Sequence, residues 1–106
     1  MQFNDYQELT GKTNEYDKEV MLSAMVSGLA AESGEVNGKY NKFIRGDMDY
    51  ETFKAYVILE AGDCLWFLSE LCTLLEVPLD FCATENIRKL KDRAERGTIK
   101  GNGDNR

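Results

Sequence analysis

Apolar residues recur at the three-to-four-residue spacing of one helix face along two long stretches of the chain. The first stretch predicts a helix from about residue 17 to residue 45, which stops at Gly46. The second predicts a helix that begins after Asp49, a good N-cap residue, and continues to about residue 76, because Pro78 forbids its extension. Only a few residues join the two helices, so we expect an antiparallel hairpin. The apolar positions are Leu22, Met25, Val26, Leu29, Val36, Tyr40, Phe43, Phe53, Tyr56, Val57, Cys64, Phe67, Leu68, Leu71, Leu74 and Leu75.

A shorter helix is expected on either side of this hairpin. The first starts at Asn4, whose side chain can cap it with Gln7 in capping-box position, and ends at Gly11. The second spans roughly residues 79–96 and is closed by Gly97. No run alternates in the manner of a half-buried strand, and proline occurs only once, so the pattern predicts an all-α fold.

The length of 106 residues fits one domain, which we place at residues 1–97. Residues 98–106 are rich in glycine and polar side chains and have no apolar face, so they are expected to form a flexible C-terminal tail. Two helices of about 40 Å with wide apolar stripes leave too much apolar surface for a monomer of this size. The chain is therefore expected to form a homodimer or homotetramer.

Two pairs of carboxylates lie inside the most apolar parts of the long helices. Glu32 and Glu35 form the first pair, and Glu60 and Asp63 form the second. Residues three apart share a helix face, with Cβ atoms about 5–6 Å apart, so each pair can point at one cation. Both pairs lie at similar distances from the predicted turn, so an antiparallel hairpin brings them to the same level. Four carboxylates in one place describe an oxygen-ligand site for Mg²⁺ or Mn²⁺.

The alternative is that these four side chains are ordinary solvated helix residues, as acidic residues mostly are. Gly34 and Gly62 weigh against that interpretation, since a glycine inside a helix costs about 1 kcal/mol relative to alanine. Close approach of the two helices, or room for a ligand, would explain both glycines.

The composition excludes several classes of function. The net charge of −6 argues against nucleic acid or an anionic membrane as a partner, and no segment is long and apolar enough for a membrane span. Histidine is absent, which rules out His-ligated zinc, Ser-His and Cys-His nucleophiles, and the Glu-x-x-His sites of ferritin-like bundles. Any metal must be held by oxygen. Three cysteines without CxxC spacing indicate reduced thiols and a cytoplasmic protein.

Three segments carry a more specific, ordered signal. Residues 28–36 contain an ExxE pair, residues 59–68 contain ExxD, and 24 residues separate Glu35 from Glu60. Residues 86–93, with the sequence NIRKLKDR, follow in the fourth predicted helix. In this order the segments resemble the MazG family of nucleoside triphosphate pyrophosphohydrolases, over most of the chain.

The resemblance implies a MazG-like helical bundle, dimeric or tetrameric. Its implied activity is the Mg²⁺-dependent hydrolysis of a nucleoside or deoxynucleoside triphosphate to the monophosphate and pyrophosphate. By position, the implied metal ligands are Glu32, Glu35, Glu60 and Asp63.

The implied substrate contacts lie on other helices. Lys89 and Arg93 would contact the phosphates, with Asn86 nearby. The regions that match base and sugar contacts hold Gln7, Tyr16 and Phe67, and Lys39 stands where family members often carry a tryptophan near the base.

Glu35 lies at the edge of the apolar stripe rather than at its centre, so it is our choice for the general base that takes a proton from the attacking water. The alternative function is a catalytically weak helical module for oligomerisation or regulatory nucleotide binding. The intact acidic set and basic pair favour the enzyme, since a degenerate module would be expected to lose at least one of them.

Overall fold

The computed structural model describes residues 1–106, and every regular element in it is helical. The elements are α1 (Phe3–Gly11), the 3₁₀ turn η1 (Lys18–Val20), α2 (Met21–Ile44), α3 (Tyr50–Leu74) and α4 (Leu79–Glu95). The predicted all-α fold is confirmed. The second predicted helix begins with the 3₁₀ turn rather than directly as an α-helix.

Local signals place the ends of these helices. The Asp49 carboxylate accepts a hydrogen bond from the Thr52 amide at 2.8 Å and caps α3 as predicted. Gly46 and Gly97 adopt φ angles of 84° and 70°, the left-handed conformation that ends α2 and α4. Glu76 adopts the same conformation, with φ of 61°, directly after α3.

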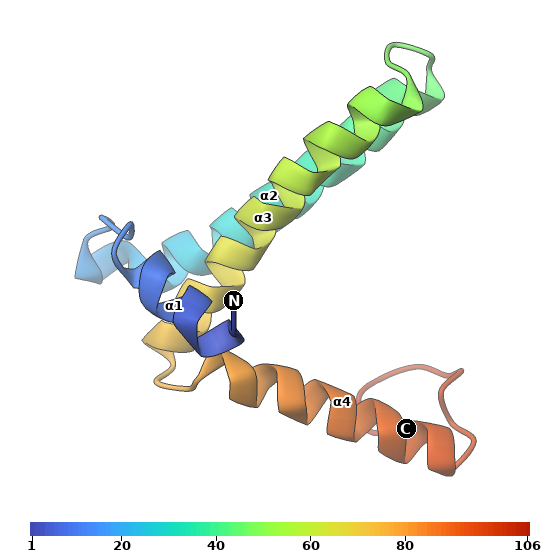
Figure 1. The fold of residues 1–106 in the computed structure, drawn as a ribbon. Coiled ribbons are helices and arrows are strands. Elements are labelled where there is room, and N and C mark those ends of the chain that lie inside the picture. Colours follow the sequence, from blue (N-terminus) through green and yellow to red (C-terminus); the bar gives the residue numbers. More distant parts are fainter.

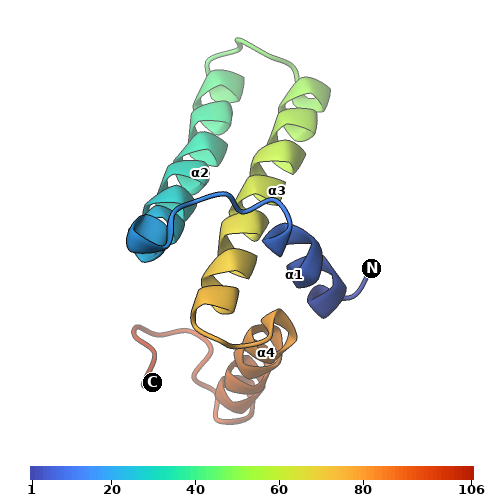
Figure 2. The ribbon, with the colours of Figure 1, turned by 90° about the vertical axis from the view of Figure 1, so that its left-hand side faces the viewer.

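The predicted capping box of α1 is wrong. Asn4 Oδ1 accepts a hydrogen bond from the Asp80 amide at 3.1 Å, so it caps α4 instead of its own helix. The Gln7 amide group donates to the Val77 carbonyl at 3.0 Å and accepts from the Leu79 amide at 2.8 Å. Both side chains form hydrogen bonds with backbone groups of the α3–α4 connection, because α1 packs against both of these helices (Figure 2).

α2 and α3 form the predicted antiparallel hairpin, which is one arm of the molecule (Figure 1). Near its tip, the Phe43 ring stacks on the Phe53 ring with centroids 4.9 Å apart. Midway along, Ser33 Oγ lies 3.9 Å from Cys64 Sγ. These contacts fix the register that brings the carboxylate pairs to one level.

α2 and α3 pack closely at Gly28 of α2. A Cβ atom added there would overlap the ring of Phe67. Gly34 and Gly62, where we considered close helix approach, have nothing within 4 Å of an added Cβ. Both glycines lie on exposed faces of their helices, so close helix approach does not explain them.

α4 forms a second arm, which leaves the end of α3 and contacts α1 and α3 but not α2 (Figure 1). The radius of gyration is 16.5 Å, whereas a globular domain of this length has about 13 Å. Only 7 of the 106 residues are buried, and they come from all four α-helices. They are Thr10, Met25, Ser69, Glu70, Cys72, Leu79 and Arg93.

None of the helices combines the length and the apolar character that crossing a membrane requires. Residues 98–106, predicted to be a flexible tail, fold back along α4 (Figure 1).

Candidate metal centre

Three of the four predicted metal ligands converge between α2 and α3. Glu32 comes from α2, and Glu60 and Asp63 come from successive turns of α3. One carboxylate oxygen from each lies within 4.8 Å of the other two. Glu32 and Glu60 are half-buried and Asp63 is exposed, so the cluster opens to solvent on one side. Such a set of oxygens can hold a divalent cation.

Glu35, the fourth predicted ligand, is exposed and stands outside this group of three. Three residues turn a helix by about 300°, so Glu35 lies about 60° around α2 from Glu32. It is close enough for its charge to act on the Glu32 carboxyl group. Its position suits a group that acts beside the cluster rather than within it.

The cluster is electrostatically strained. Burial raises the pKa of Glu32 above its ordinary value, and the charges of Asp63 and Glu60 raise it further. A hydrogen bond between the Glu32 and Glu60 carboxyl groups and the charge of Glu35 act in the same direction. Binding of a proton or of a cation would relieve this mutual repulsion.

The predicted phosphate contacts lie on the other arm. Lys89 and Arg93 are on α4, and Asn86 and Lys89 line one shallow groove there. Lys89 is partly exposed, whereas the Arg93 side chain is 4% exposed. Because α4 does not contact α2, one chain does not bring this basic pair against the carboxylate cluster.

The residues proposed for base and sugar contacts are dispersed. The Lys39 ammonium lies 4.7 Å from the centroid of the Tyr56 ring, a cation–π contact across the hairpin. Phe67 packs over Gly28 between the helices, and its ring meets that of Trp66 edge-on. Tyr16 is exposed in the segment before η1.

Gln7, also proposed as a substrate contact, is hydrogen-bonded to the α3–α4 turn, well beyond Asp63 along the chain. The Gln7 amide nitrogen donates two hydrogen bonds there and its oxygen accepts one, and a contact of Gln7 with substrate stays a prediction.

The structure also contains a buried polar network around Glu70 that the sequence pattern did not predict. Glu70 is 3% exposed and has no cationic partner. Its Oε2 accepts from the Thr10 hydroxyl at 2.7 Å, and its Oε1 accepts from the Asn14 side-chain amide at 2.8 Å. The Ser69 and Thr10 hydroxyl oxygens lie 2.8 Å apart, and either hydroxyl can be the donor. The chain Ser69–Thr10–Glu70 joins α1 to α3.

The spacing of acidic residues in the sequence could have indicated this network. Glu70 follows Asp63 by two helical turns, so it lies on the same face of α3 as Glu60 and Asp63. Burial raises the pKa of Tyr6, and the charges of Asp63 and Glu70 raise it further. The acidic stripe on α3 is thus longer than the ExxD motif.

No family model matches the sequence, and no solved structure matches it. The protein named "Gene 37 protein" from Mycobacterium phage L5 is 37% identical to it over 87 residues. The match covers 80% of this chain and 76% of the phage protein. The chain therefore belongs to the same family as the Gene 37 protein of Mycobacterium phage L5.

Proposed function

We propose that this protein is a Mg²⁺-dependent nucleoside triphosphate pyrophosphohydrolase of the MazG-like type, which cleaves its substrate to the monophosphate and pyrophosphate. The observation that carries the proposal is the convergence of Glu32, Glu60 and Asp63 from two facing helices, with oxygens within 4.8 Å. In a chain without histidine, oxygen ligands of this kind suit Mg²⁺ or Mn²⁺. The type of reaction is inferred from the resemblance of the acidic and basic segments to the MazG family.

Each group has a separate task in this proposal. Glu32, Glu60 and Asp63 would hold the cation, which would supply positive charge to the triphosphate and make a water molecule more acidic. Glu35, outside the cluster, keeps a carboxylate free to accept the proton of that water. Lys89 and Arg93 pair with phosphate oxygens.

We also propose that the active unit is a homodimer or homotetramer. The acidic cluster and the basic pair lie on different arms of one chain, and α4 does not contact α2. A second copy packed on the hairpin offers a basic pair from another chain and covers apolar surface. Large apolar side chains exposed on α2 and α3 are Leu22, Val26, Tyr40, Ile44, Tyr50, Tyr56, Ile58, Leu59, Leu68 and Leu74.

The test is a panel of ribo- and deoxyribonucleoside triphosphates with Mg²⁺, scored separately for pyrophosphate and orthophosphate. We expect pyrophosphate from at least one substrate and loss of the activity in excess EDTA. Glu60→Gln should lose most of the activity, whereas Glu51→Gln, an exposed acid in the first turn of the same helix, should keep it. Orthophosphate as the product, or full activity of Glu60→Gln, would overturn the proposal.

One observation favours the alternative, a catalytically weak nucleotide-binding module. Lys89 and Arg93 already pair with a carboxylate of their own chain, at Asp104. That module would bind nucleotide and Mg²⁺ without turnover across the whole panel, so equilibrium binding measured beside the activity separates the two functions.

A further inference from the structure

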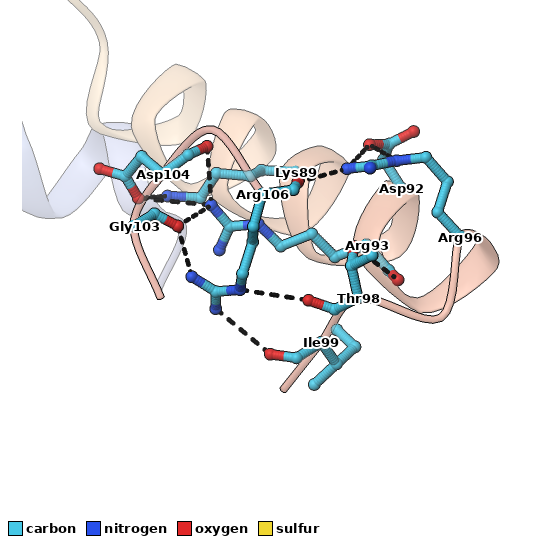
Figure 3. Close-up of polar contacts among 9 residues, drawn as sticks. All are labelled: Lys89, Asp92, Arg93, Arg96, Thr98, Ile99, Gly103, Asp104 and Arg106. Atoms are coloured by element: carbon cyan, nitrogen blue, oxygen red, sulfur yellow. Dashed lines mark hydrogen bonds and ion pairs between the residues drawn. The ribbon is translucent and has the colours of Figure 1, made fainter. Parts of the chain in front are cut away.

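The C-terminal segment, residues 97–106, is fastened to α4 by charged groups (Figure 3). Asp104 Oδ1 lies 3.1 Å from Lys89 Nζ and 3.4 Å from Arg93 Nη2. Arg93 Nη2 also donates to the Asp104 carbonyl at 2.9 Å. Arg96 Nη2 donates to the Arg106 carbonyl at 2.7 Å. The segment therefore meets the same two basic side chains that are proposed to contact phosphates.

Arg93 depends on this segment for its polar contacts. Its guanidinium group is almost fully buried, and all its hydrogen-bond partners are the Gly103 carbonyl and the carbonyl and carboxylate of Asp104. A buried charge needs such partners, because desolvation without them is costly. Whatever removes the segment must supply anionic or carbonyl oxygens to Arg93, or leave it to water.

The Asp104 carboxylate contacts both basic side chains. It lines the groove that also contains Asn86 and Lys89, together with the acidic side chains of Glu85 and Asp92. Its hydrogen bond to Lys89 and the Lys89 charge, followed by the same effects of Arg93, lower the pKa of Asp104 below its ordinary value. The pair thus favours a fully ionised oxyanion, and a carboxylate and a phosphate group offer it similar oxygens.

The segment is also easily released. Three of its ten residues are glycine, whose ordering costs the most conformational entropy. Its one large apolar side chain, Ile99, is 46% exposed, and the Asp104 side chain is 84% exposed. The Lys89–Asp104 ion pair is exposed on both sides, and such pairs contribute little stability. A multiply charged ligand can therefore compete with it.

We propose that residues 97–106 are an intramolecular ligand of the Lys89–Arg93 pair, whose Asp104 carboxylate occupies the place of a phosphate group, so that a phosphate-bearing ligand binds only as the segment leaves. The inference rests on the proposed function for the role of the basic pair. It adds regulation: the segment competes with substrate or with released pyrophosphate.

The test measures binding of inorganic pyrophosphate to the full chain by calorimetry in EDTA, so that no metal recruits the anion to the carboxylate cluster. Asp104→Asn removes the competing charge and keeps the backbone contacts, so pyrophosphate should bind about three- to fivefold more tightly. Glu95→Gln, an exposed acid on α4, removes an equal charge and should leave the affinity nearly unchanged. Equal affinities of wild type and Asp104→Asn, or equal gains in both variants, would overturn the proposal.

Two further measurements locate the effect. Lys89→Gln should weaken pyrophosphate binding with and without Asp104→Asn, and an unchanged affinity would place the anion elsewhere and refute the competition. In NMR spectra of the wild type, saturating pyrophosphate should move the Gly101 and Gly103 amide signals to positions typical of an unstructured chain. Signals that stay in place would also refute it.

The outcomes separate this inference from the proposed function. Tighter binding by Asp104→Asn, with no hydrolysis of any triphosphate in the panel, supports the competing segment and rejects the enzyme. Hydrolysis with no effect of Asp104→Asn on binding rejects the segment's role alone.

Discussion

At Gly28, an alanine methyl group would occupy space now filled by the Phe67 ring. Alanine normally stabilises a helix interior by about 1 kcal/mol relative to glycine. Here the overlap should outweigh that gain, because forced shifts in packed regions cost about 1–3 kcal/mol. Gly28→Ala should therefore lower the free energy of unfolding measured by urea denaturation.

Gly34→Ala is the matched control for that experiment. Nothing lies within 4 Å of its added Cβ, so it should gain up to about 1 kcal/mol in the same helix. A Gly28→Ala protein as stable as Gly34→Ala would show that α2 and α3 are not held together at Phe67.

Glu32 should make the metal-free protein lose stability as the pH rises. Its pKa in the folded state is raised, so the folded state holds this proton more firmly than the unfolded state does. The stabilising effect of protonation is present below the unfolded pKa and disappears as the pH passes through the raised value.

The measurement is urea unfolding in EDTA between about pH 4 and about pH 7, with wild type compared with Glu32→Gln. Asp49 and Asp104, whose pKa values are lowered, act in the opposite direction in both proteins and cancel in the difference. A difference that is constant across this range would contradict the expectation.

At the scale of elements, the Glu70 network attaches α1 to α3. Both Glu70 oxygens accept hydrogen bonds, from Thr10 and from Asn14, whereas a glutamine can accept at only one of these positions. Glu70→Gln should therefore cost about 1–3 kcal/mol of stability, the cost of leaving a buried polar group unpaired. Glu8→Gln, an exposed acid on α1, should change it by less than about 0.5 kcal/mol. Equal stabilities of these two variants would rule out the network as an anchor.

The carboxylate cluster joins α2 to α3 in the same way once a cation is present. Mg²⁺ that binds only the folded state should raise the free energy of unfolding by about 2.7 kcal/mol at a hundredfold excess over its dissociation constant. The melting temperature should rise accordingly. The double variant Glu32→Gln/Glu60→Gln should lose most of this response and be more stable than wild type in EDTA, because it relieves the repulsion. An unchanged wild-type melting temperature in millimolar Mg²⁺ would indicate that the carboxylates are ordinary solvated helix residues rather than a metal site.

The helices could be predicted from the sequence because their signals act within one turn. Asp49 caps the residues directly after it, and Gly97 ends the helix directly before it. The α1 capping box failed because Asn4 and Gln7 bond to residues more than 70 positions away. No local pattern reports such a contact.

The convergence of the three carboxylates could also be predicted from local signals. Helical period and turn position together brought Glu32 to the level of Glu60 and Asp63. The folding back of residues 97–106 could not be predicted, because it depends on arginine side chains that bond to backbone carbonyls. Composition alone marks that stretch as flexible.

For the whole molecule, the small buried core leads us to expect that folding and association are coupled. With 7 of 106 residues buried, a single chain removes little apolar surface from water. Light scattering at micromolar concentration should therefore give a dimer or tetramer, and the melting temperature should rise with protein concentration. A stable species of 12.0 kDa whose melting temperature is independent of concentration would contradict this expectation.

The close packing at Gly28 also bears on which ion the hairpin accepts. Oxygens on opposite sides of Mg²⁺ lie about 4.2 Å apart, whereas around the larger Ca²⁺ they lie about 5 Å apart. The three carboxylate oxygens lie within 4.8 Å of one another, a span of the same size as these two distances. One helical turn away, Phe67 over Gly28 sets how near α2 and α3 can come. A side chain at that position would widen the gap and favour the larger ion, so a residue that touches no cation would help to select among cations by radius.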